Sequence, residues 1–306
     1  MASLRDIRNR ISSVKSTQQV TRAMKMVAAA KLRRAQERIF RTRPYAYKIS
    51  EIISHLRHFV DPASHPLFGE RESINAALLV VVTADRGLAG AFNGNIIKVA
   101  EQTIRDRYAR LHADGNLYLV CIGRKAHEHF QKRGYQLVGD YRNLMDKLDS
   151  AMAAGIVDLV VRGYQEGRWD EVNIVYNEFK NTISQNRIVE PFLPIPSEQF
   201  ITPVMEKEVG HHAETKDGVA VDYIFEPRAS TILDVLVPRY LNFQLFRALL
   251  ESNAAEQGAR MVAMDNATSN ADELMRDLKL KYNRARQDAI TKELIEITSG
   301  ADALSN

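Results

Sequence analysis

Both ends of the chain carry apolar residues at a seven-residue period, and this pattern constrains the fold more than any other feature. One frame starting at Leu4 holds across residues 4–60, and a second runs from Leu236 to Ala289. Such a frame predicts a long helix with one narrow apolar seam that packs against another helix. A helix of about 50 residues is about 75 Å long at ~1.5 Å per residue, which is several times the mean length in globular proteins.

The two predicted helices lie at opposite ends of the chain, and each has a single seam. They are therefore most simply paired with each other as an antiparallel two-helix coiled coil. Small residues in the seams, such as Ala28 and Ala254, would let the helix axes approach closely. We expect Pro44 to kink the first helix locally.

Between the helices the period changes, and apolar runs alternate with helical stretches. The runs cover residues 76–83, 117–122 and 172–179, and the helical stretches lie near residues 93–110, 124–132 and 146–164. This alternation predicts an inserted Rossmann-like α/β domain with a largely parallel sheet. After Arg187 the chain becomes rich in proline and extended, and a further strand is predicted at residues 219–225. The predicted domains are residues 1–60 (N-terminal coiled-coil helix), 74–226 (α/β domain) and 227–306 (C-terminal helix, paired with 1–60).

The net charge of +4 conceals a strong asymmetry along the chain. The first 57 residues carry a net charge of +11, and the remainder carries −7. A basic helix of this kind is attracted to nucleic acid, to an anionic membrane surface or to an acidic protein surface, and it can also be a plain solvated face. The longest apolar run has seven residues, Ala76 to Val82, too few to cross a bilayer. The single cysteine, Cys121, excludes an internal disulfide and favours an intracellular protein.

The sequence offers no convincing catalytic, cofactor or metal site. The stretch Asp85 to Gly90 sits where a phosphate-binding loop would lie, but it lacks G-x-G-x-x-G and G-K-S/T. A tight strand-to-helix turn is the favoured interpretation, with nucleotide binding as the alternative, and Asp85 and Arg86 are expected to pair with each other or with a partner. His127 and His129 are spaced i,i+2, which points them apart on a helix, so we expect surface residues rather than metal ligands.

Three segments resemble a known family over nearly the whole chain. They are Ile11–Arg34 (ISSVKSTQQVTRAMKMVAAAKLRR), Thr83–Asn93 (TADRGLAGAFN) and Glu251–Ala303, which contains ARMVAMDNAT and YNRARQDAITKELIEITSGADA. On these motifs the chain is identified as a member of the gamma subunits of rotary, proton-driven ATP synthases, of bacterial type. The second motif departs from the family's pattern at Thr83, Ala84 and Ala89, where Ser and Cys or Gly are expected.

The resemblance implies a non-catalytic rotor shaft without cofactors. In that family the shaft couples ion-driven rotation of the c-subunit ring to conformational changes at the beta-subunit catalytic sites during ATP synthesis, and so regulates ATPase activity and ion flow. The implied partners are three alpha and three beta subunits, the epsilon subunit and the c ring, with no nucleic acid. The implied location is peripheral, on the cytoplasmic face of the bacterial inner membrane. The polar patch at Gln18, Thr21 and Lys25 is then expected to face the surrounding subunits.

The resemblance also carries over contact residues, position by position. Contacts with the alpha/beta hexamer are implied for Met24, Lys25, Lys31, Arg33, Arg34, Arg260, Arg286, Gln287, Thr291, Glu293 and Glu296. Contacts with the c ring and epsilon subunit are implied for Tyr223 and Glu226. For each residue the alternative is a solvated helix charge or a core aromatic.

Two other functions remain alternatives at this point. One is a nucleic-acid-binding basic coiled coil, although its basic residues would precede a clean zipper, whereas here they are interleaved with the heptads. The other is an α/β nucleotide-binding enzyme with helical arms, which would need a cofactor pocket that the incomplete glycine pattern does not favour.

Overall fold

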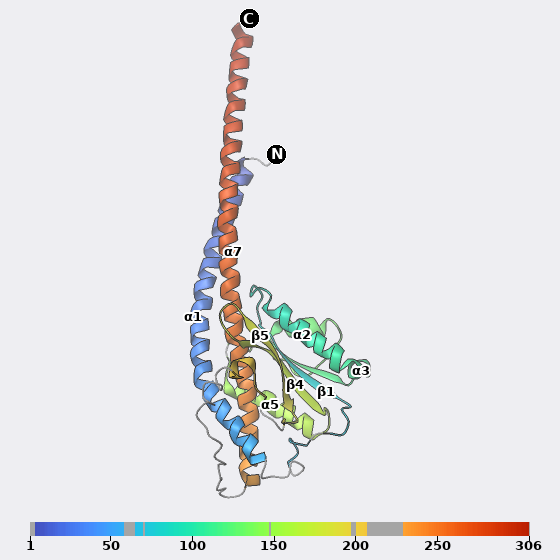
Figure 1. Cartoon of the computed structure of the whole chain (residues 1–306). Helices are drawn as coiled ribbons and strands as arrows, with labels where there is room; N and C mark the ends of the chain where they lie inside the picture. Colours follow the sequence, from blue (N-terminus) through green and yellow to red (C-terminus); the bar gives the residue numbers. More distant parts are fainter. Residues whose placement is uncertain are drawn as a thin grey trace. The chain divides into compact units, whose positions relative to one another are not determined.

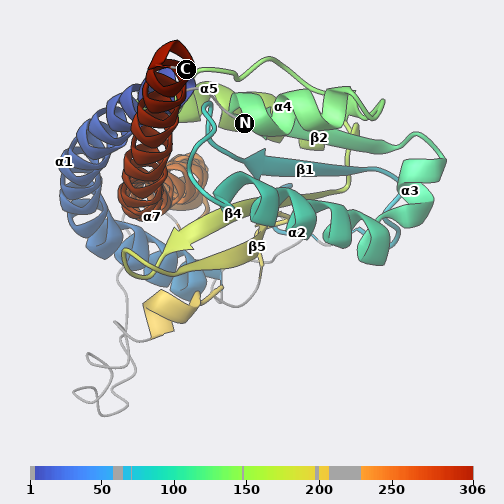
Figure 2. The ribbon, with the colours of Figure 1, turned by 90° about the horizontal axis from the view of Figure 1, so that it is seen from above.

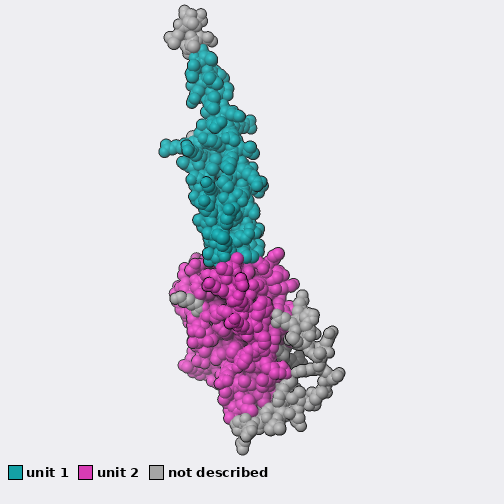
Figure 3. Space-filling model, turned by 90° about the vertical axis from the view of Figure 1, so that its left-hand side faces the viewer, with its two compact units in different colours: residues 1–28, 261–306 teal, residues 29–260 magenta. Residues whose placement is uncertain are grey.

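The computed structural model describes residues 4–57, 65–69, 71–146, 148–196, 200–206 and 229–305. The chain divides into two compact units, residues 1–28 with 261–306 and residues 29–260 (Figure 3). Two long helices contribute to both units, α1 (Leu4–Arg57) and α7 (Ala229–Ser305) (Figure 1). Among the described residues no helix combines the length and the apolar character needed to cross a membrane.

The first unit is an antiparallel pair of helix segments, as the heptads predict. Contacts pair Gln18 of α1 with Asp272 of α7, Thr21 with Thr268, and Lys25 with Asp265, so residue numbers rise on one helix as they fall on the other. Seam positions such as Ala28, Met264, Ala271 and Leu278 are buried. The predicted coiled-coil frame is therefore confirmed.

For Gln18 and Thr21 the expectation that the polar patch of α1 faces surrounding subunits is wrong, because both side chains are buried. Lys25 stays 40% exposed, and all three polar side chains bond across the seam. Thr21 Oγ1 lies 2.8 Å from Thr268 Oγ1, and Lys25 Nζ lies 2.6 Å from Asp265 Oδ1. Because each polar group finds a partner on α7, the patch can occupy seam positions at little cost. We call these six residues (Gln18, Thr21, Lys25, Asp265, Thr268 and Asp272) the polar layer.

We expect the polar layer to set the register of the helix pair more than its stability. Replacing both Thr21 and Thr268 by valine removes both hydroxyls together, so the free energy of unfolding should change by less than about 1 kcal/mol. An apolar seam tolerates alternative registers, so spin labels at the exposed positions Ser13 and Lys279 should give a broader distance distribution than in the unsubstituted chain. An unchanged distribution would show that the apolar positions alone fix the register.

The second unit contains a mixed five-stranded sheet. Its strands are β1 (Ala77–Val82), β2 (Leu117–Ile122), β3 (Gln136–Leu137), β4 (Glu171–Phe179) and β5 (Gln185–Leu193), in the order β3-β2-β1-β4-β5. The first four strands pair in parallel and β5 is antiparallel to β4. The helices that follow the strands are α2 (Phe92–Arg107), α3 (Ala109–Ala113), α4 (Arg124–Gln131) and α5 (Ser150–Gln165). This confirms the predicted α/β insertion with a largely parallel sheet.

The sheet is buried on both faces, which explains why β1 reads as a continuous apolar run. Ala77, Leu79 and Val81 pack in one cluster with α2 and α4, and α2 lies against β1 and β4 (Figure 2). Leu78 and Val80 pack in the other cluster, with α5 and with the parts of α1 and α7 that belong to this unit.

The segment after Arg187 was predicted only to be extended, but residues 188–193 belong to β5. Pro191 lies inside this strand, and a proline cannot donate to a ladder of hydrogen bonds. It is tolerated because β5 is an edge strand and because the register with β4 shifts between Val172 and Asn173, where Pro191 pairs. The proline pattern thus concealed a strand from sequence reasoning.

Helix α1 runs through Pro44 without interruption, and its light-blue part bends (Figure 1). The predicted stretch near 146–164 begins later than expected, because Asp149 caps α5 by accepting from the backbone N–H of Ala151. The strand predicted at residues 219–225 lies outside the described residues.

Candidate functional site

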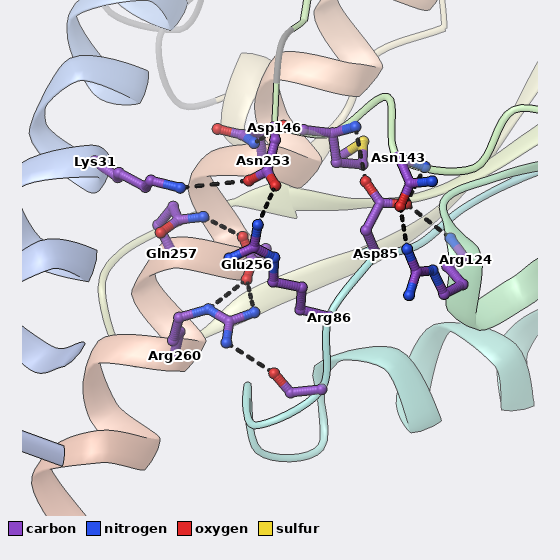
Figure 4. Close-up of polar contacts among 12 residues, drawn as sticks. Lys31, Asp85, Arg86, Arg124, Asn143, Asp146, Asn253, Glu256, Gln257 and Arg260 are labelled. Carbon is purple, nitrogen blue, oxygen red and sulfur yellow. Dashed lines mark hydrogen bonds and ion pairs between the residues drawn. The ribbon is translucent and has the colours of Figure 1, made fainter. Parts of the chain in front are cut away.

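The loop between β1 and α2 carries the second recognised motif, and Asp85 organises it. The Asp85 carboxylate accepts backbone hydrogen bonds from Arg124 (2.9 Å), Asn143 (2.7 Å) and Met145 (3.1 Å) (Figure 4). Three donors satisfy a carboxylate that is 7% exposed. Asp85 therefore ties the end of β1 to the start of α4 and to the segment before α5.

The neighbouring residue, Arg86, does not pair with Asp85. Its guanidinium contacts Asp146 at 2.9 Å, and the same carboxylate faces Lys31 of α1 at 3.4 Å (Figure 4). Asp85 and Arg86 therefore contact different elements. Asp85 holds the loops of the α/β insertion together, and Arg86 pairs with Asp146, whose carboxylate also contacts α1.

The same loop is bonded to α7 through Arg260. Its Nη1 donates to the carbonyl oxygen of Gly87 at 2.7 Å, and its Nε donates to Glu256 at 2.7 Å (Figure 4). The Glu256 carboxylate also accepts from the Gln257 amide. Burial raises the pKa of Glu256, and the adjacent Arg260 charge opposes that rise. The long helix and the recognised loop are thus joined by the hydrogen bond from Arg260 to Gly87, and the ion pair with Glu256 within α7 holds the Arg260 side chain in place.

The interior of this loop is occupied by a protein side chain. Asn93 Oδ1 accepts from the N–H of Ala84 at 2.9 Å, and its Nδ2 donates to the carbonyl of Arg86 at 3.3 Å. A phosphate-binding loop leaves its backbone N–H groups free for the ligand, whereas here Ala84 already has a partner. This favours the tight strand-to-helix turn over nucleotide binding.

His127 and His129 have different surroundings. His129 lies 2.8 Å from Glu101, while His127 is buried, so the expected surface position is wrong for His127. Within the described ranges no three His, Cys, Asp or Glu side chains lie close enough together to hold a metal ion.

Four of the implied contact residues lie in the second unit, and they differ in how free they are. Arg33 is 84% exposed, with a long contact to Glu37 at 3.4 Å. Arg34 is exposed, and Lys31 is half-exposed beside Asp146. Arg260 is different, because its side chain is 11% exposed and is committed to Glu256. Lys31, Arg33 and Arg34 thus present positive charge to solvent, whereas the charge of Arg260 is paired within the chain.

The other described contact residues lie in the first unit. Met24 is partly buried and Lys25 belongs to the polar layer. Five residues are exposed on the last turns of α7: Arg286, Gln287, Thr291, Glu293 and Glu296. Their contacts are local, such as Thr291 Oγ1 to the Gln287 carbonyl at 2.9 Å and Lys292 to Glu296 at 3.7 Å. Their exposed faces are available to a partner. Tyr223 and Glu226 lie outside the described residues.

Sequence reasoning missed the acidic residues that hold these basic ones. Asp146 lies 115 residues from Lys31 in the sequence, so no local pattern marks it. Glu256 lies four residues before Arg260 on the same helix, and this spacing was a local signal for the pair. The heptad frame did offer one signal, because Arg247 and Gln257 are polar exceptions in the apolar seam of α7 and both are buried.

Comparison with known proteins identifies the family. The family model described as "ATP synthase" matches residues 3–304. The ATP synthase gamma chain of Salinibacter ruber is 62% identical over 304 residues, covering 99% of both chains. The chain belongs to the ATP synthase gamma-chain family. The gamma chain of Chloroherpeton thalassium is also similar, at 50% identity over 306 residues and 99% of both chains.

Solved structures show the same fold. A chain of the Euglena gracilis mitochondrial ATP synthase, described with its OSCP, F1 and c-ring, is similar with a TM-score of 0.66 at 20% identity, covering 98% of this chain and 94% of that one. A chain of the Tetrahymena thermophila mitochondrial enzyme, described as central stalk and c-ring, gives 0.53 at 24% identity, covering 81% and 99%. The resemblance found in the sequence is confirmed. As a gamma chain, this protein is a non-catalytic subunit of the ATP synthase complex, which removes the nucleic-acid-binding and nucleotide-binding-enzyme alternatives.

Proposed function

We propose that the chain is the central shaft of a bacterial ATP synthase. In this role it sits inside a hexamer of three alpha and three beta subunits, contacts the epsilon subunit and the c ring, and turns with the ring. The observation that carries the proposal is the full-length match to a gamma chain at 62% identity. The antiparallel coiled coil supports it, because a shaft needs a long and stiff element.

The charge of α1 suits acidic surfaces on the beta subunits. In the first unit Arg5, Arg8, Arg10, Lys15 and Arg22 are exposed, and in the second unit Lys31, Arg33, Arg34, Arg38 and Arg41 have exposed positions. Opposite charges steer association and select the partner more than they add affinity. The residues Met24, Lys25, Lys31, Arg33 and Arg34 are proposed to face these acidic surfaces.

The last turns of α7 suit a different surface. Ile290, Leu294, Ile295 and Ile297 are between 48% and 67% exposed there. Apolar side chains gathered on a surface mark a contact site for another protein. We assign this segment, with Arg286, Gln287, Thr291, Glu293 and Glu296, to contacts inside the alpha/beta hexamer.

Rotation acts on catalysis through differential contact. A shaft whose basic and apolar faces differ presents a different surface to each beta subunit in each orientation, so it stabilises a different conformation of each catalytic site. Torque from the ring enters the chain where it contacts the c ring and the epsilon subunit, a contact to which Tyr223 and Glu226 are assigned. The whole complex, not this chain, then makes or hydrolyses ATP. Because the matched gamma chains are bacterial, we propose that the complex lies at the inner membrane, with this chain on the cytoplasmic face.

Reconstitution tests the proposal directly. The chain is mixed with alpha and beta subunits, and native mass and ATPase activity are recorded with and without it. We expect one copy per three alpha–beta pairs and activity only when the chain is present. If a known gamma subunit assembles under the same conditions and this chain does not, the proposal fails.

Charge reversal on α1 separates binding from folding. Arg33→Glu with Arg34→Glu removes exposed positive charge, so association with the alpha/beta hexamer at low salt should slow by about tenfold or more. The matched control is Lys98→Glu with Lys132→Glu, two exposed changes in α2 and just after α4 that alter the net charge equally and that we assign to no partner. Stopped-flow association rates at two salt concentrations make the comparison. Equal slowing by both variants would mean that net charge alone, and not this face, controls association.

A further inference from the structure

Two buried ion pairs hold α7 in the second unit. Arg247 and Glu251 lie one helical turn apart on α7 and are 5% and 1% exposed. Arg247 Nη2 lies 2.6 and 2.7 Å from the two carboxylate oxygens of Glu190 in β5. Glu251 accepts from Arg43 Nε of α1 at 2.8 Å. We call Arg43, Glu190, Arg247 and Glu251 the clasp.

The clasp is bonded into the sheet as well as across the helices. Glu190 also accepts from the Tyr176 hydroxyl at 2.6 Å and from the Gln244 amide at 2.9 Å. Burial raises the pKa of Tyr176, so its hydroxyl stays protonated and donates. Glu251 Oε2 accepts from the backbone N–H of Phe179 at 3.0 Å. Four elements, α1, β4, β5 and α7, are therefore joined by directional bonds at one level of α7.

Burying these charges is not needed for stability. The surrounding cluster is apolar, with Leu241, Leu245, Ala248 and Leu249 of α7 completely or almost completely buried. Replacing a buried ion pair by apolar residues of similar size is often neutral or stabilising, because desolvation offsets the attraction. What the pairs add is a defined position and rotation of α7. A shift of α7 by one residue, about 1.5 Å with a turn of about 100°, would leave buried charges unpaired, whereas apolar contacts are non-directional.

This distinction matters for a helix that is twisted about its own axis. Apolar packing resists separation of a helix from a sheet but resists sliding and rotation much less. Charge-assisted hydrogen bonds resist displacement in every direction because their strength depends on distance and angle. The clasp bonds β4 and β5 of the α/β insertion to α1 and α7, so in a rotating shaft force applied to the insertion passes to the two helices through these bonds.

We infer that the clasp is the torque-bearing joint between the α/β insertion and the two shaft helices. The inference rests on the proposed shaft function. Arg43, Glu190, Arg247 and Glu251 are positioning residues that touch neither nucleotide nor ion. They limit how far the α/β insertion slips relative to the shaft helices when the shaft turns against a load, and therefore how much rotation is lost.

The test removes the charges while keeping two of the local hydrogen bonds. In the variant Arg43→Met, Glu190→Gln, Arg247→Met, Glu251→Gln, the two new amide oxygens can still accept from Tyr176 and Phe179, whereas the bond from Gln244 to the other Glu190 oxygen is lost. Wild-type and variant chains are assembled into complete ATP synthase in sealed vesicles, and ATP hydrolysis and ATP-driven ion pumping are measured together. The load is varied by setting the opposing ion gradient. The matched control is Glu166→Gln with Arg168→Gln, an exposed ion pair of the same unit at 2.6 Å.

We expect the variant to hydrolyse ATP at a rate within twofold of wild type, while ions pumped per ATP fall at least threefold at high load and little at low load. The control should match wild type at every load. If the ratio of ions to ATP in the clasp variant equals the wild-type ratio at all loads, the inference is overturned, whether or not both rates change together. If the wild-type chain itself fails to assemble or to pump, the proposed function fails instead.

A second variant keeps the inference testable if the fourfold variant does not assemble. Arg247→Lys keeps the charge but replaces the two-bond contact with Glu190 by a single point donor. The same vesicles should then show a smaller fall in the ratio, again confined to high load. A ratio equal to wild type at every load overturns the inference here as well.

Discussion

Replacing Gly123 by alanine is expected to lower the free energy of unfolding by at least about 4 kcal/mol. Gly123 joins β2 to α4 with φ +98° and ψ 145°, a region open essentially only to glycine. A Cβ at this position would lie 2.1 Å from the backbone oxygen of Thr83 and 2.8 Å from its carbonyl carbon. Backbone cannot swing aside as a flexible side chain can, so the end of β1 must separate from the start of α4.

The Gly123→Ala substitution should also disturb the loop between β1 and α2. Thr83 Oγ1 accepts from the N–H of Ala126, and Asp85 accepts from the N–H of Arg124, so both bonds depend on the approach of these two segments. Urea unfolding followed by the fluorescence of Trp169, the single tryptophan, measures the effect inside the same unit. The matched control is Gly155→Ala, because Gly155 is exposed in α5 with nothing within 4 Å of an added Cβ. The free energy of unfolding of this control variant should rise by about 1 kcal/mol. Equal free energies of unfolding for Gly123→Ala and Gly155→Ala would contradict the argument from geometry.

The architecture was largely predictable because it depends on repeated signals. Each of the two long helices repeats its apolar seam over many heptads, and the runs that became β1, β2 and β4 are apolar because both faces of the sheet are covered. β5 was missed since Pro191 disguises an edge strand, and β3 has only two residues. The bounds 1–60, 74–226 and 227–306 stay predictions.

The candidate site was less predictable, because its contacts are long-range and polar. A seam position filled by Gln18 or Thr21 looks like an outward patch until the matching Thr268 and Asp272 are seen across the helix pair. The spacing of Glu256 and Arg260 permits an ion pair, but the sequence does not show that the pair is buried or that Arg260 also bonds to the Gly87 carbonyl. Family motifs identify which residues matter, but only the fold shows which of them are already paired within the chain.

Arg260→Gln is expected to destabilise the second unit by about 3 kcal/mol at pH 8 and by much less at pH 5. The substitution leaves the Glu256 carboxylate, 5% exposed, without its ion pair, and it removes the bond to the Gly87 carbonyl. Burial already holds the pKa of Glu256 above its ordinary value of 4.5, and loss of the Arg260 charge raises that pKa further. The folded state then binds the Glu256 proton more tightly than the unfolded state. Stability therefore falls as pH rises from about 4.5 through the raised pKa.

Urea unfolding of Arg260→Gln and wild type at pH 5, 6, 7 and 8, followed by Trp169, checks both the size and the sign. The double variant Glu256→Gln with Arg260→Gln is the control, because a neutral amide pair should recover most of the loss at pH 8 and remove the extra pH dependence. A destabilisation of Arg260→Gln that is equal at every pH would show that Glu256 does not depend on Arg260. If the double variant assembles into a coupled enzyme and Arg260→Gln does not, the role of Arg260 is to neutralise Glu256. If both lose coupling equally while folding normally, Arg260 contacts a partner subunit directly.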